Sequence, residues 1–202
     1  MNGLAICLER SYERPLHISR SCADTSSVAI LATHGRSIRS MKLEMLSKRS
    51  STKKRILQQS FFGTIPLPAL DKLVVETRTP RVNQPGTPAT HTACRYKRVI
   101  RRIDQEESLL PSLVNLSIIY ANFAIPFYFP ALQTLDLIRI TLAQPYIHAL
   151  SVGLPKLTRL VVKGCQWDED YDVAATGPIT FSHLQSIHVS EGSDTEYLLD
   201  AI

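Results

Sequence analysis

Short stretches of alternating apolar and polar residues recur along the chain, most of them introduced by a proline. In the clearest copy, Leu154 to Cys165, the order is apolar residue, proline, any residue, leucine, two residues, leucine, any residue, apolar residue. The remaining copies span 67–75, 110–118, 129–137, 181–189 with serine in place of proline, and, more weakly, 38–43. A period of two places the final apolar residues of each copy on one face of a strand. The pattern therefore predicts six short strands, each with one apolar face.

The spacing of the copies indicates how the strands are arranged. We number each copy by the leucine two residues after the proline position, which stands at 70, 113, 132, 157 and 184; in the weak copy we use its first apolar residue, Ile38. The steps between successive copies are therefore 32, 43, 19, 25 and 27 residues. The last three steps lie near the 20 to 29 residues of a leucine-rich repeat, and the two long steps coincide with polar insertions. One copy cannot bury its apolar row alone, whereas stacked copies can. We expect an α/β fold: a leucine-rich-repeat-like solenoid with parallel strands on the concave face, and helices and irregular loops on the convex face.

Other segments predict the elements around these strands. A strand is expected at 15–18 and helices at 21–36, 96–110, 141–152 and from 194 onward, with Pro145 in the first turn of the fourth helix and Gly153 closing it. The serine- and lysine-rich stretch 47–60 predicts a basic loop. The proline- and threonine-rich stretch 79–95 predicts a disordered insertion. All of these segments belong to one irregular domain, 1–202.

Composition places the chain among intracellular proteins. Of 202 residues 44% are hydrophobic, and no apolar run is long enough for a membrane span. The first nine residues have no positively charged start and include Glu9, which argues against a secretion signal. The four cysteines are scattered, as expected in a reducing compartment. We expect a cytoplasmic or nuclear protein that does not bind membranes.

Charge is distributed unevenly along the chain. Residues 1–130 hold 19 Lys and Arg against 9 Asp and Glu, and residues 131–202 hold 4 against 9. The basic segments 48–55 and 95–102 could contact nucleic acid, but no aromatic residue interleaves with the charges of the first. A solvated loop is the favoured interpretation, and nucleic acid is the less favoured partner.

Residues able to carry chemistry do not form a catalytic or metal-binding pattern. Cys165 stands where a leucine-rich repeat places Asn or Cys to satisfy turn backbone groups, so a structural role is expected. Asp168, Asp170 and Asp172 match the start of a calcium loop, yet Val173 and Ile179 occupy the positions of the required glycine and glutamate. The six histidines show no ligand spacing. We expect no metal, no cofactor and no enzymatic activity.

The alternation also assigns candidate binding residues. Side chains beside the buried positions of the strands point to the opposite face, which is the usual binding surface of repeat proteins. On the expected concave face these candidates for binding a protein ligand are Lys72, Val74, Glu76, Asn115, Ser117, Ile119, Thr134, Asp136, Ile138, Arg159, Val161, Lys163, Ser186, His188 and Ser190.

The amino-terminal part resembles the region that follows the F-box in fungal, basidiomycete-type F-box proteins. The resemblance rests on Leu8-Glu9-Arg10-Ser11, on Pro15-Leu16-His17-Ile18, and on the stretch from His34 to Leu43, followed by the repeats from residue 65 onward. It departs from the family in two respects: no F-box is visible ahead of residue 4, and the tryptophan expected near Ser37 is missing.

This resemblance implies a substrate receptor of a cullin-based ubiquitin ligase, in which the F-box holds the ligase adaptor and the repeats hold the substrate. We expect the chain to supply the substrate-binding half, and to bind the adaptor only in a longer form that carries an F-box. A stand-alone leucine-rich-repeat scaffold, a truncated product and a nucleic-acid-binding protein are the alternatives.

Overall fold

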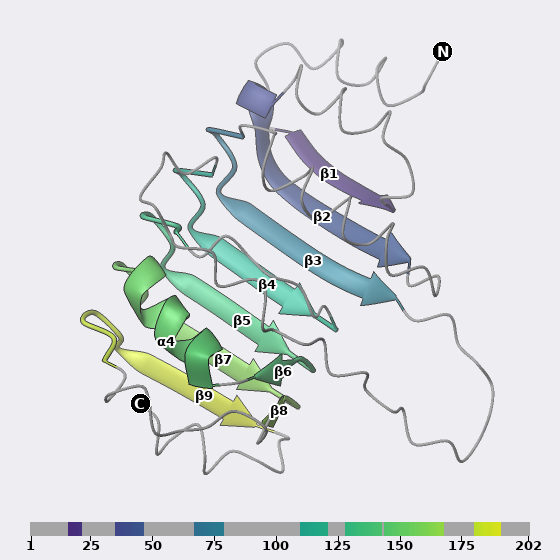
Figure 1. Ribbon diagram of the computed structural model, residues 1–202. Helices are drawn as coiled ribbons and strands as arrows, with labels where there is room; N and C mark the ends of the chain where they lie inside the picture. The colour runs from purple at the N-terminus through teal and green to yellow at the C-terminus, as the bar shows by residue number, and fades with distance from the viewer. Residues whose placement is uncertain are drawn as a thin grey trace, which may run out of the picture.

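Seven parallel strands form a single sheet in the order of the chain (Figure 1). The computed structural model describes residues 16–21, 35–46, 67–78, 110–120, 128–142, 144–167 and 180–190. The strands are β1 (Leu16–Ser21), β2 (Ile38–Leu46), β3 (Lys72–Arg78), β4 (Asn115–Ile119), β5 (Thr134–Ile138), β7 (Arg159–Lys163) and β9 (Ser186–Ser190). All six sequence copies are strands of this sheet, parallel and side by side as predicted, and β1 adds a seventh.

Register is constant from β2 to β9, so each residue lies beside its counterpart in the next copy. Leu73 of β3, for example, pairs with Leu116 of β4, which pairs with Leu135 of β5. Only the β1–β2 pair shows a shift, between Leu16 and His17. Constant register turns the repeated sequence pattern into continuous rows of equivalent side chains across the sheet.

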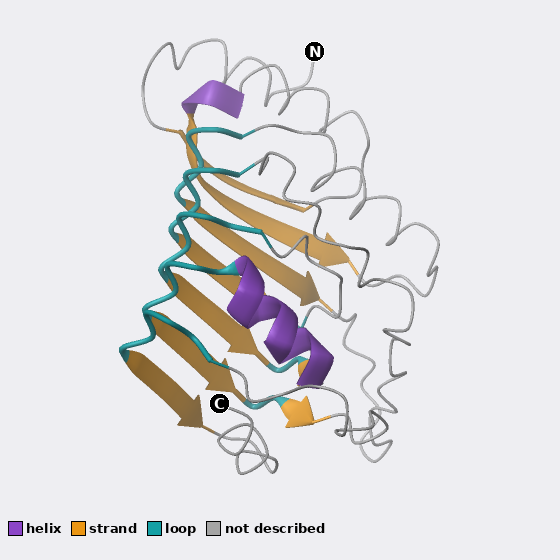
Figure 2. Cartoon of the chain, turned by 60° about the vertical axis from the view of Figure 1, so that its left-hand side comes forward, coloured by secondary structure: helices purple, strands orange, loops and turns teal. Residues whose placement is uncertain are grey.

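In five copies a tight turn leads into the strand, and four of these turns contain the proline. All five close with the same hydrogen bond, from the N–H of the leucine at the end of the turn to the carbonyl three residues earlier, at 3.1 Å in the first (Leu70 to Leu67) and 3.4 Å in the last (Leu184 to Phe181). Proline fits the second position of such a turn because its φ is already fixed near the required value. Figure 2 shows these turns stacked along one edge of the sheet.

The fifth turn carries Ser182 where the other four have proline, and this predicts a stabilising substitution. Among the residues that the structure describes, the Ser182 N–H donates no backbone hydrogen bond, so proline would remove none. We expect Ser182→Pro to raise the free energy of unfolding by about 0.4–1 kcal/mol, because it restricts the unfolded chain. Urea unfolding measures the gain, and Ser182→Ala is the control without it. A loss of stability in the proline variant would show that this turn differs from the other four.

The opposite ends of three strands share a left-handed residue. Tyr120, Arg139 and Gly164 directly follow β4, β5 and β7, with φ of 53°, 53° and 60°. Their N–H groups donate to the last carbonyl of the next strand at 3.0, 2.7 and 2.8 Å. This conformation is unfavourable by roughly 1–2 kcal/mol for a residue with a Cβ atom. Stacking between neighbouring copies therefore imposes the turn even on tyrosine and arginine.

One helix, α4 (Gln144–Gly153), packs against one face of the sheet (Figure 2). Its Ile147 and Leu150 belong to the buried core. Pro145 lies in the first turn as predicted, where its missing N–H costs no helical hydrogen bond. The predicted start at Thr141 is wrong, because Thr141–Leu142 form β6, which pairs with β8 (Gln166–Trp167) in a second parallel sheet.

Only the two ends of the helix predicted at 21–36 lie among the described residues, and the predicted start at Ser21 is wrong. Ser21 is the last residue of β1, and Gly35–Ser37 form a short 3-10 helix, η1, directly before β2. The intervening residues, 22–34, lie outside the described part of the chain. So do the segments predicted as basic loop and disordered insertion, most of the helix predicted at 96–110, and the one predicted from residue 194.

Apolar side chains fill the face of the sheet that α4 covers. Leu73, Leu135 and Leu160 are fully buried, at 0% exposure. The leucines of the turns extend the same core, which ends at β9, where Ile187 is 36% exposed. Each copy thus buries its apolar row against the next one, which is the arrangement that the alternation predicts. In the part of the chain described here, no helix has the length and apolar character needed to cross a membrane.

Candidate functional site

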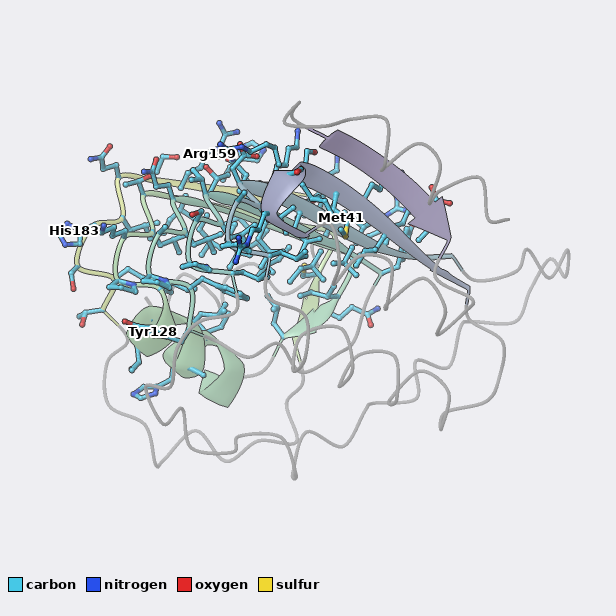
Figure 3. The ribbon with its side chains drawn as sticks, turned by 90° about the horizontal axis from the view of Figure 1, so that it is seen from above. Met41, Tyr128, Arg159 and His183 are labelled. Atoms are coloured by element: carbon cyan, nitrogen blue, oxygen red, sulfur yellow. The ribbon has the colours of Figure 1, made fainter. Side chains whose placement is uncertain are left out.

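The candidate site is the outer face, which we define as the face of the sheet opposite α4 from β2 to β9. Figure 3 shows Arg159 on this side and Tyr128 on the side of α4. Because register is constant, the outer face consists of three rows that cross six strands. The first row is Ser40, Lys72, Asn115, Thr134, Arg159 and Ser186; the second is Lys42, Val74, Ser117, Asp136, Val161 and His188; the third is Glu44, Glu76, Ile119, Ile138, Lys163 and Ser190.

All fifteen residues predicted for the binding face lie together in these rows. The prediction missed the three contributed by β2, namely Ser40, Lys42 and Glu44. Their signal was present, since they alternate with the buried Met41 and Leu43. This copy shows the alternation over a shorter stretch than the others, residues 38–43, and has no turn of the Leu-Pro-x-Leu kind before it.

Ion pairs join β2 to β3 at one end of the outer face. The Nζ of Lys42 lies 2.9 Å from Oε2 of Glu76 and 3.4 Å from Oε1 of Glu44. The hydrogen bond to Glu76 is the main cause of a raised pKa for Lys42, with a smaller contribution from Glu44. Exposed pairs of this kind add at most about 1 kcal/mol to stability. The pair with Glu76 links β2 to β3, whereas the pair with Glu44 lies within β2.

Asp136 lies near the centre of the outer face, between Ser117 and Val161 in the second row. Burial raises the pKa of its carboxyl group, and the positive charges of Arg159 and Lys72 oppose that rise without cancelling it. The charged carboxylate is therefore less well solvated in the folded protein than in the unfolded chain.

This raised pKa predicts a pH-dependent gain from Asp136→Asn. A raised pKa means that the folded state binds the proton more tightly, so the contribution of Asp136 to stability is full below pH 3.8, its ordinary pKa, and is lost as pH rises through the folded value. We expect Asp136→Asn to be more stable than wild type at pH 7 and close to wild type in stability at pH 3.

Urea unfolding at the two pH values measures this difference. Ser117→Ala, a neighbouring change without charge, should show no such dependence on pH. A less stable Asp136→Asn protein at pH 7 would mean that Arg159 and Lys72 outweigh the burial of the carboxylate.

Cys165 has the structural role expected from its position. Its side chain is 8% exposed, and its Sγ donates to the Leu137 carbonyl, in the neighbouring copy, at 3.3 Å. Burial raises the pKa of the thiol, while hydrogen bonds from the backbone partly lower it. A buried thiol held in its protonated form does not act as a nucleophile.

The described residues contain no cluster of three or more histidine, cysteine or acidic side chains that could hold a metal ion. His183 and His188 are exposed and His148 is half-buried. Asp168, Asp170 and Asp172 lie outside the described residues. What the structure offers to a ligand is thus a mixed polar and aliphatic surface.

No protein-family model matches the chain, and neither a curated protein nor a solved structure matches it. The observations that bear on the function of the chain are therefore the geometry of the outer face and the resemblance of its sequence to F-box proteins.

Proposed function

We propose that the chain is a leucine-rich-repeat-like solenoid that acts as a protein-interaction module through its outer face. The seven-stranded parallel sheet supports this architecture, because its strands lie side by side in the order in which they occur along the chain. The spacing of the repeat pattern is also present in Leu157, Leu160, Val162 and Cys165. The Sγ of Cys165 donates a hydrogen bond to the Leu137 carbonyl in the adjacent copy. In this architecture the outer face is the concave one.

The observation that carries the proposed function is the composition of the outer face. It combines four cations and three carboxylates with half-buried aliphatic residues such as Val74, Ile119 and Val161. This is not the strongly basic stripe expected of a nucleic-acid-binding surface. A mixture of apolar and charged groups of both signs suits a protein ligand better.

Size narrows the kind of ligand. Five strand spacings of about 4.8 Å and four residue steps of about 3.3 Å give a face of roughly 24 by 13 Å between backbone positions. We infer that the outer face has room for an extended segment of a partner chain, of about seven residues at about 3.3 Å each.

The resemblance to F-box proteins supplies the biological role that we propose. Leu16–Ile18 of its second motif lie in β1, and residues 35–43 of its third motif lie in η1 and β2, at the start of the same sheet. In this role the outer face holds the substrate of a cullin-based ubiquitin ligase, while an F-box in a longer form holds the ligase adaptor. A stand-alone scaffold would use the same face without the ligase.

Site-specific photo-crosslinking in cells tests the interaction module. We expect benzoylphenylalanine at position 117, on the outer face, to capture a defined partner protein. The same group at position 152 should not capture it, although Val152 is 63% exposed on α4. The purified partner should then bind wild type, bind Ser117→Arg at least tenfold more weakly, and bind Val152→Arg unchanged.

Capture of that partner equally from both positions, or loss of affinity in neither variant, would refute the proposed site. A partner that binds the outer face but is not ubiquitylated by a longer, F-box-containing form with its ligase would identify the chain as a stand-alone scaffold.

A further inference from the structure

Strand β9 lies at one end of the sheet, and one of its two edges faces away from β7 (Figure 1). The Ser186 N–H and the Ser190 carbonyl bond to the residues that flank β7, at 3.1 and 2.8 Å. Because peptide groups alternate in direction along a strand, those of Ile187 and Val189 face the other edge. We call it the open edge, since no strand among the described residues pairs with it.

The buried apolar row is incomplete at the open edge. Leu135 and Leu160 are 0% exposed, whereas Ile187, their counterpart in the same row, is 36% exposed. Ile187 has a neighbouring strand on one side only among the described residues. Sheets commonly protect such an edge with lysine, another charged residue or proline, and residues 186–190 include none of these. The open edge therefore has the composition of an edge that accepts a further strand.

The sequence of β9 indicates which strand fits, because it reads nearly the same in both directions. Serine stands at each end, a β-branched apolar residue follows inward from each serine, and His188 stands at the centre. When this strand pairs antiparallel with a second copy about His188, Ile187 lies opposite Val189 of the second copy and serine lies opposite serine. Each pair of Ile187 with Val189 exchanges both N–H···O bonds, since these are the peptide groups that face the open edge.

We propose that two copies of this chain associate through the open edges of β9, antiparallel and about a twofold axis at His188. Ile187 of each copy packs against Val189 of the other, which continues the buried row across the axis. The dimer is closed, because both open edges are used. Both outer faces lie on the same side of the joined sheet, so this inference goes beyond the proposed function and does not depend on it.

Engineered cysteines test the register of the dimer. Residue 188 lies opposite its own counterpart in a pair without hydrogen bonds, where the Cα atoms are about 4.5 Å apart. A disulfide spans Cα separations of about 4.4–6.8 Å. His188→Cys should therefore form an intermolecular disulfide under mild oxidation, seen by non-reducing gel electrophoresis. Wild type, with its four native cysteines, gives the background.

Ser186→Cys is the matched control, with the same number of cysteines. Its two copies would stand four residues apart along the paired strands, or about 13 Å, which is too far for a disulfide. Ser186→Cys alone should therefore remain at background. Mixed with Ser190→Cys, which lies opposite it in the proposed register, it should form the cross-linked dimer.

Sedimentation velocity measures the association without oxidation. We expect wild type to form dimers as its concentration rises. His188→Lys places two positive charges opposite each other at the axis and should weaken the dimer at least tenfold, whereas His188→Thr should retain it. His188 is exposed, so both variants should fold, as circular dichroism can check. Val189→Pro removes an N–H that faces the open edge and should also give a monomer.

Several results would overturn the inference. These are equal cross-linking of His188→Cys and Ser186→Cys, a wild type that is monomeric at every concentration, and a dimer that His188→Lys leaves unchanged. Open-ended assemblies would mean that β9 pairs with the opposite end of the sheet in the next copy, which also contradicts it. So would a monomer whose open edge binds a strand of another protein. The proposed function is tested separately, at position 117 of the outer face.

Discussion

Leu135→Ala is expected to lower the free energy of unfolding by about 3–5 kcal/mol, the range found for leucines in well-packed cores. Leu135 is completely buried and lies between its register partners Leu116 and Leu160 in the middle of the sheet. The strands on both sides are fixed by their own pairing, so they cannot close fully around the missing side chain. Since a whole domain has a stability of only about 5–15 kcal/mol, this loss should be large and easily measured by urea unfolding at 25 °C.

Two controls show whether burial is the cause. Thr134→Ala, one residue earlier and on the outer face, should cost less than about 1 kcal/mol. Ile187→Ala, the counterpart of Leu135 in β9, should cost less than Leu135→Ala because Ile187 is 36% exposed. Equal losses at 134 and 135 would contradict the assignment of the two faces.

Gly164→Val is expected to cost at least about 1–2 kcal/mol, because a side chain with a Cβ is unfavourable at positive φ and a β-branched one most of all. The N–H of Gly164 donates to the Ser190 carbonyl at 2.8 Å, so relaxing the backbone would remove one of the hydrogen bonds that join β7 to β9. The expected result is a lower midpoint of thermal unfolding, with the greatest loss of protection from amide hydrogen exchange in β9.

Asparagine at the same position separates backbone strain from crowding. Its side chain is similar in size to valine but tolerates the left-handed region. Gly164→Asn should therefore retain most of the stability, and a loss as large as that of valine would mean that the side chain lacks space. In the reverse experiment, Arg139→Gly should be nearly neutral, since relief of strain offsets the loss of the contact with Tyr120 and the greater freedom of the unfolded chain.

The strands were predictable because two local signals agree at each of them. Alternation with period two identifies the buried face, and the turn residue sets the start: Lys72, Asn115 and Thr134 each begin a strand four residues after a proline. Because that distance is the same in the four copies that carry the proline, the register of their strands was implicit in the sequence as well.

Features that depend on neighbouring copies were not predictable. Strands β6 and β8 have two residues each, and they exist because Thr141 and Leu142 lie beside Gln166 and Trp167. Nothing in a tyrosine or an arginine indicates positive φ, so the turns at Tyr120 and Arg139 follow from the hydrogen bonds of the stack. Only Gly164 carried a local hint of this conformation.

The candidate site, like the fold, was predictable from the sequence only in part. Alternation assigned fifteen residues to one face, and the register of the strands brings them together with three more from β2. Which residues become neighbours along a row depends on which strands are adjacent, and this information comes from topology. The identity of the ligand and the link to ubiquitin remain predictions.

Constant register makes the shape of the sheet independent of the path by which the chain returns to it. The leading leucines of β3 and β4 are separated by 43 residues and those of β4 and β5 by 19, yet both pairs are aligned in the same way. Each excursion can therefore grow or shrink by tens of residues without moving a residue of the outer face. Insertions in these segments should leave the arrangement of the three rows as it is.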